Sequence, residues 1–418
     1  MIPYIDSGNT AWVMMATAMV LLMTVPGLAF FYGGLVKRKN VLSILMQCFV
    51  TLSVVSLLWV VCGYSLSFSP GKGAFAGFIG SLDWAMLRHV GMEPSPYTIA
   101  QPNARVPHLA FMMFQSMFAV ITPALIIGAF AERMKFASFL VFTVLWSLCV
   151  YAPVTHWMWS SDGWLFKMGA IDFAGGIVVH VNAGIAALVT AIIIGRRHNL
   201  RPTPPHNLTH TAMGTGLLWF GWFGFNAGSA LAADGLAVNA FVATNTAGAA
   251  AALTWFVLDW VFQKRATMLG IATGAVAGLA AVTPASGYVD AGGAMVIGFG
   301  VSLICYLFVM VMKSRLGFDD ALDAFGVHGL GGIWGSLAAG LFATPLVQPA
   351  VKGLIYGNAH LFKVQLIAVG VTIVYSFVLT YVIYSVIDIV MGVRVSEKEE
   401  AMGLDVSHHN ERAYTVIE

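Results

Sequence analysis

Long runs of apolar residues separated by short polar stretches are the dominant pattern of this chain. A helix needs roughly 20 apolar residues to cross a bilayer, and eleven runs approach that length. They are too long and too continuously apolar for the alternating strands of a membrane barrel. We therefore predict an all-α polytopic membrane protein with eleven transmembrane helices, at about 10–33, 41–66, 108–131, 136–155, 173–195, 209–229, 236–262, 266–284, 290–312, 325–344 and 364–392.

Composition excludes a soluble globular domain. Hydrophobic residues make up 59% of the chain and charged residues only 10%, whereas soluble domains usually carry about 25% charged residues. The four cysteines, Cys48, Cys62, Cys149 and Cys305, lie in apolar runs without metal-ligand spacing, so we expect neither a disulfide nor a metal site. No basic region precedes the first apolar run, so we do not expect a cleaved signal peptide.

The distribution of basic residues predicts the orientation. An odd number of spans puts the termini on opposite sides, and cytoplasmic segments carry the excess of Lys and Arg. With the N-terminus outside, the cytoplasmic segments hold fifteen of the 21 basic residues, Lys37, Arg38, Lys39, Arg133, Lys135, Arg196, Arg197, Arg201, Lys264, Arg265, Lys313, Arg315, Arg394, Lys398 and Arg412. The outer segments hold Lys72, Arg88, Arg105, Lys167, Lys352 and Lys363. We predict a cytoplasmic (inner) membrane protein with a cytoplasmic C-terminus.

Two segments outside the spans are long. The external loop of about 67–107 contains Gly and Pro and is expected to cap the outer face. The tail, 393–418, is polar enough to be cytosolic and follows the transmembrane domain of 1–392. The tail is the natural place for regulation or partner contact, although its composition fits a disordered end equally well.

A short repeat links two distant apolar segments. Val179-His180 and Val327-His328 are each followed by Gly and Ile four and five residues past the histidine. This pairs span five with span ten. Five spans are an odd number, so the halves, about 10–195 and 209–344, must enter the membrane from opposite sides, as in inverted-repeat transporters with a site near the midplane. Helix 364–392 falls outside the repeat and is expected to brace it.

His180 is predicted to lie near mid-membrane, because it follows Asp172 by eight residues, about 12 Å along a helix. Intramembrane ionisable residues are expensive and usually functional. A lone neutral His can instead join two helices by a hydrogen bond, but a matched pair with His328 favours function. We expect the two imidazoles to face each other, share one hydrogen bond and line a narrow path. Burial disfavours their charged forms, so the pair suits proton relay better than alkali-cation binding.

Asp172 has two interpretations. It begins the segment that carries His180, and Asp is strongly favoured as a helix N-cap. Alternatively, its carboxylate lies near an outer vestibule and stabilises an arriving cation. The two roles are compatible.

Several motifs together resemble the ammonium transporter (Amt/Mep) family, in its bacterial form. They are Asp172-Phe-Ala-Gly-Gly with His180, Gly221-Trp-Phe-Gly-Phe-Asn-Ala-Gly-Ser229, Phe130-Ala-Glu-Arg133, Thr283-Pro-Ala-Ser-Gly-Tyr288 and Phe325-Gly-Val-His328-Gly. The resemblance runs from about residue 10 into the tail, where Gly403-Leu-Asp-Val-Ser and Glu411-Arg-Ala-Tyr414 also match. Five motifs in the same order make chance agreement very small.

The resemblance implies an outer site for ammonium at Trp159, Phe118 and Ser229. Cation–π attraction to a Trp ring contributes about 1–2 kcal/mol where the cation is partly desolvated, and a serine hydroxyl can accept an N–H bond that a metal ion cannot donate. Trp159 could instead belong to an interfacial aromatic belt. Below this site the resemblance implies a gate of two stacked phenyl rings, Phe118 and Phe225. Trp222 and Thr283 match positions associated with the pore.

Three comparisons with family patterns refine this interpretation. The segment 160–171 is slightly longer than the family pattern, which affects the vestibule rim and leaves the pore unchanged. Both histidines are present, unlike branches in which an acid replaces the first. The aromatic set around Trp159 differs from that of the related Rhesus-type branch.

The implied function is ammonium uptake, with methylammonium as an analogue. Ammonium would lose its proton at the phenyl gate, and ammonia would pass the twin histidines with or without a separately relayed proton. The resemblance also implies a homotrimer with one pore per subunit, and a cytosolic nitrogen-regulatory PII protein as a partner. A sensor that signals through a cytosolic partner and a transporter of another small amine or cation remain alternatives. Apart from membrane lipid, no further partner is expected: no cofactor, metal or nucleic acid. No paired acid–base or nucleophile motif indicates an enzyme.

Overall fold

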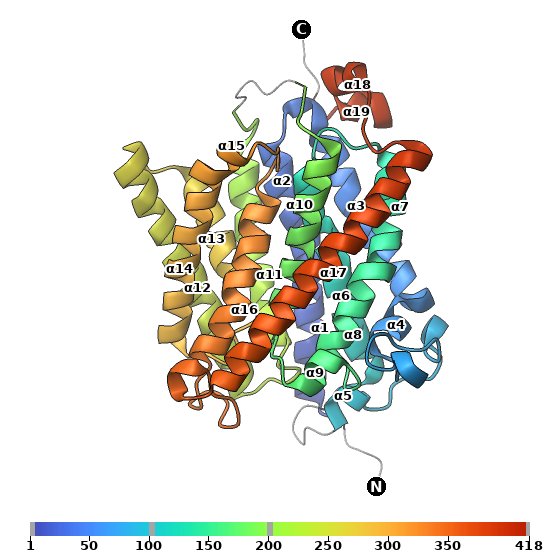
Figure 1. Ribbon diagram of the computed structural model, residues 1–418, viewed down its shortest axis with the longest axis vertical. Coiled ribbons are helices and arrows are strands. Elements are labelled where there is room, and N and C mark those ends of the chain that lie inside the picture. Colours follow the sequence, from blue (N-terminus) through green and yellow to red (C-terminus); the bar gives the residue numbers. More distant parts are fainter. Residues whose placement is uncertain (1–4, 100–104, 199–203, 415–418) are drawn as a thin grey trace.

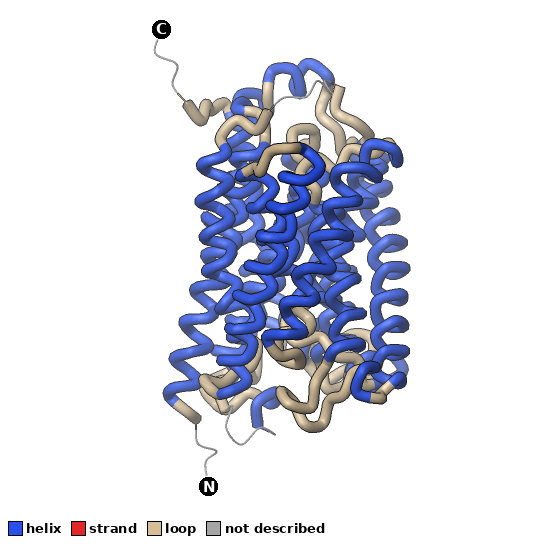
Figure 2. Tube along the Cα trace, turned by 90° about the vertical axis from the view of Figure 1, so that its left-hand side faces the viewer, coloured by secondary structure: helices blue, strands red, loops and turns tan. Residues whose placement is uncertain are grey.

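The computed structural model describes residues 5–99, 105–198 and 204–414; Arg201, one of the predicted cytoplasmic residues, lies outside them. Helices stand side by side along the long axis, and the described residues contain no strand beyond isolated bridges at Pro94–Pro107 and Met134–Arg394 (Figures 1 and 2). The prediction of an all-α bundle is confirmed. The start of α1 and the tail helix α19 lie at opposite ends of the molecule (Figure 1).

The α-helices have the following bounds: α1 Ser7–Leu22, α2 Ala29–Leu35, α3 Val41–Leu58, α4 Tyr64–Phe68, α5 Pro96–Ile99, α6 His108–Phe130, α7 Phe136–Trp146, α8 Ala152–Trp159, α9 Trp164–Met168, α10 Asn182–Ile194, α11 Leu208–Gly228, α12 Gly235–Leu258, α13 Met268–Val282, α14 Ala291–Leu307, α15 Lys313–Leu316, α16 Leu330–Phe342, α17 Ala359–Met391, α18 Glu397–Met402 and α19 Leu404–His409. Short π-helical turns join several of them into longer spans. One of these turns contains Pro26, which cannot donate a backbone hydrogen bond and bends the first span.

Nine helices within the described ranges are long and apolar enough to cross a membrane. The chain is therefore a multi-pass membrane protein. Two predicted spans, 209–229 and 266–284, correspond to α11 and α13, which are not among the nine. α13 has only 15 residues, and α11 contains several Gly and Thr residues and one His. The count of eleven stays a prediction.

Glycines of the short sequence repeat bring the two halves into backbone contact. A Cβ on Gly184 would lie 2.2 Å from the Cα of Gly329, and a Cβ on Gly332 would lie 2.7 Å from the nitrogen of Val181. Each repeat glycine thus packs against the histidine segment of the other half. Small residues allow helices to approach closely in this way.

α17 crosses the outside of the bundle diagonally (Figure 1). It packs against α10, α16 and α7, as a helix outside a five-plus-five repeat would. The described parts of the external loop, 67–99 and 105–107, form short turns and α5 at the end opposite the tail (Figure 1). The tail forms α18 and α19 at the other end, so the alternative of a disordered end does not hold for its described part, 393–414.

Candidate functional site

His180 and His328 occupy equivalent positions in the two halves. His180 lies in a π-helical turn, η7 (Gly176–Val181), and His328 in another, η10 (Phe325–Gly329). Each turn continues directly into an α-helix, α10 or α16. Single π-turns are rare and frequently mark functional sites, since the extra residue re-aims the side chains around it.

The planes of the two imidazoles are nearly parallel. Their ring centroids are 5.2 Å apart with an interplanar angle of 12°, and the residues are only 1% and 4% exposed. Nδ1 and Nε2 of His180 and Nδ1 of His328 have no hydrogen-bond partner among the described residues. The prediction of a hydrogen bond shared between the rings is therefore wrong.

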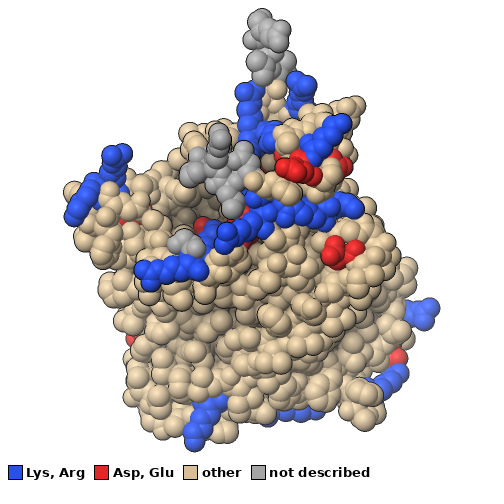
Figure 3. All heavy atoms as spheres, turned by 45° about the horizontal axis from the view of Figure 1, so that its top comes forward, with Lys and Arg blue, Asp and Glu red and all other residues tan. Residues whose placement is uncertain are grey.

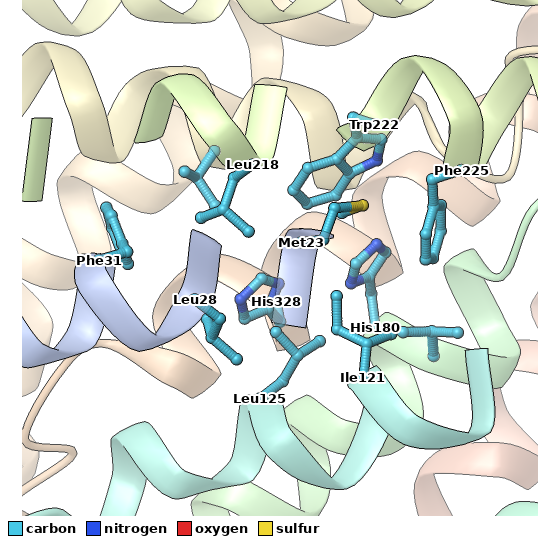
Figure 4. A pocket seen from close by; sticks show the side chains of 12 residues that line it. Met23, Leu28, Phe31, Ile121, Leu125, His180, Leu218, Trp222, Phe225 and His328 are labelled. Atoms are coloured by element: carbon cyan, nitrogen blue, oxygen red, sulfur yellow. The ribbon is translucent and has the colours of Figure 1, made fainter. Parts of the chain in front are cut away.

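A narrow cavity of about 10 Å³ lies along the histidines, close to the space that one water molecule needs. Figure 4 shows His180 and His328 among apolar side chains from several helices. Trp222 stacks on His180 at 5.6 Å, and its indole N–H donates to Thr283 Oγ1 over 2.9 Å. Ammonia, which is about as large as water, fits a space of this size. The rest of the lining is Met23, Leu28, Phe31, Ile121, Leu125, Val179, Leu218, Phe225 and Val276.

Aromatic rings continue from this cavity toward the end of the molecule at which α1 begins, which we call the outer end after the predicted orientation. Phe225 on α11 lies 6.1 Å from His180, and its ring centroid is 4.4 Å from that of Phe118 on α6. Phe118 in turn meets Trp159 edge to face at 5.6 Å. Both phenylalanines are buried. The structure thus brings the five predicted residues Trp159, Phe118, Phe225, His180 and His328 together in one line.

Larger cavities lie at both ends of this line. The outer cavity, about 480 Å³, is lined by Trp159, Ser229 and Asp172 among others. Ser229 directly follows α11, and its hydroxyl donates to the carbonyl of Phe225 over 2.9 Å, which leaves the oxygen lone pairs free to accept. The inner cavity, about 510 Å³, reaches His328 and Asp323. The narrow histidine segment therefore separates two wide vestibules.

Asp172 acts as a backbone cap. Its carboxylate accepts four N–H bonds of 2.6–3.0 Å, from Gly175, Gly176, Ile177 and Val178. Burial raises the pKa of Asp172 to about 6, while these four donors oppose the rise, so the group is mostly ionised at neutral pH. The capping interpretation agrees with this geometry. Asp172 also lines the outer cavity, and its role toward an arriving cation stays a prediction.

The loop that contains Asp172, just before η7, also holds Trp159 in place. The Trp159 indole N–H donates to the carbonyl of Asp172 over 2.8 Å. Gly175 has φ 111°, and a Cβ there would lie 2.6 Å from Val179 and 3.4 Å from the Trp159 ring. Only glycine fits this position without strain.

Asp320 is a residue that the sequence reasoning missed. It is fully buried and accepts N–H bonds from Ala324 (3.0 Å), Phe325 (2.9 Å) and Gly326 (3.4 Å). It precedes His328 by eight residues, as Asp172 precedes His180. The spacing Asp-x7-His in both halves was the signal that could have revealed it.

A buried ionic cluster lies at the tail end of the bundle. Arg197 contacts Glu132 at 2.8 Å and both carboxylate oxygens of Asp319 at 2.8 Å. Burial by itself would raise the pKa of Asp319, but the bonds and charge of Arg197 lower it to about 2. Glu132 belongs to the Phe130-Ala-Glu-Arg motif, whereas Arg197 and Asp319 carried no signal beyond charge.

The tail packs onto this cluster. Glu400 on α18 pairs with Arg394 at 2.9 Å and accepts the N–H of His198 over 2.8 Å. Asn40 accepts the N–H of Leu404 over 2.8 Å, and Asp405 accepts that of Ser43 over 2.8 Å. Figure 3 shows basic side chains gathered around the acidic tail helices at this end.

Comparisons with known proteins agree with this architecture. The chain is 48% identical to an ammonium transporter of Bacillus subtilis (strain 168), over 97% of this chain and 98% of the relative. It is 46% identical to the ammonium transporter Amt1 of Archaeoglobus fulgidus, over 98% of this chain and 100% of the relative. Its fold matches the crystal structure of Saccharomyces cerevisiae Mep2 with a TM-score of 0.86 at 34% identity, covering 94% of this chain and 88% of that chain. A structure described as a Sensor Amt Protein matches with a TM-score of 0.86 at 30% identity, covering 96% and 98%.

The family described as the Ammonium Transporter Family matches residues 11–414, which is nearly the whole chain. The expected resemblance is therefore confirmed: this chain is a member of the Ammonium Transporter Family.

Proposed function

We propose that the protein takes up ammonium from outside the cytoplasmic membrane and releases it to the cytoplasm. Family membership supports ammonium transport. The observation that carries the mechanism is the line of rings from Trp159 to His328, which joins the outer and inner vestibules through a cavity of only about 10 Å³.

Ammonium is recruited in the outer vestibule. Trp159 and Phe118 offer ring surfaces to the cation, and Ser229 offers an acceptor oxygen. Cation–π attraction contributes about 1–2 kcal/mol here if the cation is partly desolvated. A potassium ion cannot donate a hydrogen bond to Ser229, so the site prefers ammonium over an ion of similar size.

The proton is lost at the gate of Phe118 and Phe225. A charge at the bilayer centre costs at least about 2.5–3.5 kcal/mol, and no Asp or Glu lines the histidine cavity. The stacked phenyl rings provide no polar group to replace hydration. Neutral ammonia therefore crosses more readily than ammonium, and the nitrogens of His180 and His328 supply polar contacts along the cavity.

The fate of the proton distinguishes two versions. It returns to the outer side, or it follows the histidines to the cytoplasm and makes transport electrogenic. Protein reconstituted into liposomes and measured on a solid-supported membrane decides between them. Ammonium-evoked charge movement is expected in the electrogenic version, and its complete absence alongside measurable methylammonium uptake would exclude that version.

The histidines are tested in the same preparation. We expect the double variant His180→Ala/His328→Ala to lose selectivity for ammonium over potassium. His360→Ala, at the exposed start of α17, is the matched control and should behave as the wild type. Full selectivity in the double variant would contradict the proposed role of the pair.

The remaining features are proposed on the same basis: a homotrimer with one pore per subunit, the N-terminus outside, and a cytosolic PII protein docking at the tail end. The docked tail and the matching Sensor Amt structure favour one alternative, a sensor that signals through such a partner. Co-purification with a PII protein across nucleotide and 2-oxoglutarate conditions tests docking. Competition between ammonium, methylammonium and potassium for uptake tests the other alternative, a carrier of a different small amine or cation.

A further inference from the structure

Gln365 is a buried amide on α17, the helix outside the repeat. Its side chain is 0% exposed, so its amide must find partners within the protein. The Ile171 N–H donates to Gln365 Oε1 over 2.9 Å, and Gln365 Nε2 donates to the Ile171 carbonyl over 2.9 Å. Nε2 also donates to the Ser336 carbonyl over 3.0 Å. One side chain therefore binds two segments that are far apart in the sequence.

The bonds to Ile171 form a reciprocal pair, like the paired backbone bonds between two antiparallel strands. Two bonds to one residue fix both its position and its orientation. A flipped amide would put its NH₂ group against the Ile171 N–H and its oxygen against two carbonyls, so only one orientation is satisfied. Gly340 makes room for this contact, since a Cβ there would lie 2.9 Å from Cγ of Gln365.

The two segments lead to the two halves of the pathway. Ile171 immediately precedes Asp172, whose carbonyl holds the Trp159 indole and whose carboxylate caps the turn that carries His180. Ser336 lies on α16, which continues from the turn that carries His328. Gln365 thus ties the outer loop of the first half to the pore helix of the second.

We infer that Gln365 is a positioning residue for substrate recruitment: it fixes the Ile171–Asp172 backbone and, through it, the ring of Trp159. This inference rests on the proposed recruitment of ammonium at Trp159. It gives α17 a role in transport beyond bracing the bundle.

Three variants in the full-length protein test it. Gln365→Leu removes all three hydrogen bonds at similar volume. Gln365→Glu, when protonated, keeps one acceptor and one donor for Ile171, but when ionised it faces two carbonyl oxygens with a negative charge. The matched control is Ser376→Ala, which removes another buried bond of α17, from Ser376 Oγ to the Asn182 carbonyl at 2.9 Å, without touching the outer loop.

The first measurement is the half-saturating ammonium concentration of transport. For Gln365→Leu, which removes three hydrogen bonds, we expect at least a roughly three- to tenfold increase, the net effect of a single one of them, with a nearly unchanged maximal rate. In Gln365→Glu the value should rise as pH increases from about 6.5 to 8.5, whereas the wild type should not show this trend. Ser376→Ala should match the wild type.

The second measurement is backbone hydrogen–deuterium exchange, which does not depend on transport. Exchange in the segment 168–176 should become faster in Gln365→Leu and remain unchanged in Ser376→Ala. Faster exchange with an unaltered half-saturating concentration would overturn the positioning role, as would equal effects of Ser376→Ala. If Gln365→Leu does not fold, the test rests on Gln365→Glu. A half-saturating ammonium concentration that does not change with pH in Gln365→Glu would also overturn the positioning role. A wild type without saturable ammonium transport would instead refute the proposed function, and the exchange result would still report on Gln365.

Discussion

Replacing Asp172 by Asn should weaken ammonium recruitment much more than the matching change in the other half. The Asp172 carboxylate accepts four backbone N–H bonds, two on each oxygen. Asn keeps one oxygen and presents an NH₂ group to the other two donors. Each buried N–H left without an acceptor costs about 1–3 kcal/mol, so the loop and η7 should lose about 2–6 kcal/mol of local stability. Because the Asp172 carbonyl holds Trp159, the aromatic site moves with the loop.

Asp320→Asn is the matched control. Asp320 caps the equivalent turn with three N–H bonds, but it lies toward the inner end and holds no ring of the outer site. Both variants should lower the thermal unfolding midpoint of the purified protein. Only Asp172→Asn should raise the half-saturating ammonium concentration, by at least about tenfold, since 1.4 kcal/mol already corresponds to tenfold. Equal increases in both variants, or an unchanged value in Asp172→Asn, would refute this reasoning.

Two further predictions concern the outer loop and the tail. The pKa of Asp172 is raised to about 6, so its ionised fraction falls as external pH drops through 6; the half-saturating ammonium concentration should rise between about pH 7 and pH 5. This pH trend should be absent in Asp172→Asn, and its persistence there would assign it to another group. Glu400→Ala removes the bonds to Arg394 and His198, so hydrogen exchange across α18 and α19 should accelerate. The exposed Glu397→Ala on the same helix should change nothing, and slow exchange in Glu400→Ala would show that other contacts hold the tail.

Hydropathy and the short repeat predicted most of the architecture, because the length of an apolar run and the position of a small residue can both be read from the sequence alone. The repeat glycines, Gly184 and Gly332, indeed lie where the halves meet. The helix class and the family followed from local patterns, and both are confirmed. α11 and α13 show the limit of this approach: α13 has only 15 residues and α11 carries polar residues, so apolar length identifies neither of them as a span.

The geometry of the site was harder to predict. Sequence placed His180 and His328 together but gave no information on ring orientation, which depends on the π-turns and on packing against Trp222. The hydrogen bond expected between the histidines is not observed, since neither ring nitrogen of His180 has a partner among the described residues. The contacts of Arg197 and Gln365 join segments more than a hundred residues apart, and no local pattern encodes such pairs.

The two halves share the same local structure around their histidines, but the loops that contain the capping Asp residues make different contacts. In each half the carboxylate of an Asp caps a π-helical turn, and that turn carries a His eight residues after the Asp. A Gly four residues after the His packs against the other half. Under the proposed function, the symmetric parts make a pore that has no preferred side. The asymmetry comes from what each cap loop holds: Asp172 holds Trp159 and is tied by Ile171 to Gln365, whereas Asp319, beside Asp320, holds Arg197 and the ionic cluster under the tail. Under the proposed function, selection therefore belongs to the outer loop, regulation to the inner one, and the histidines between them serve passage.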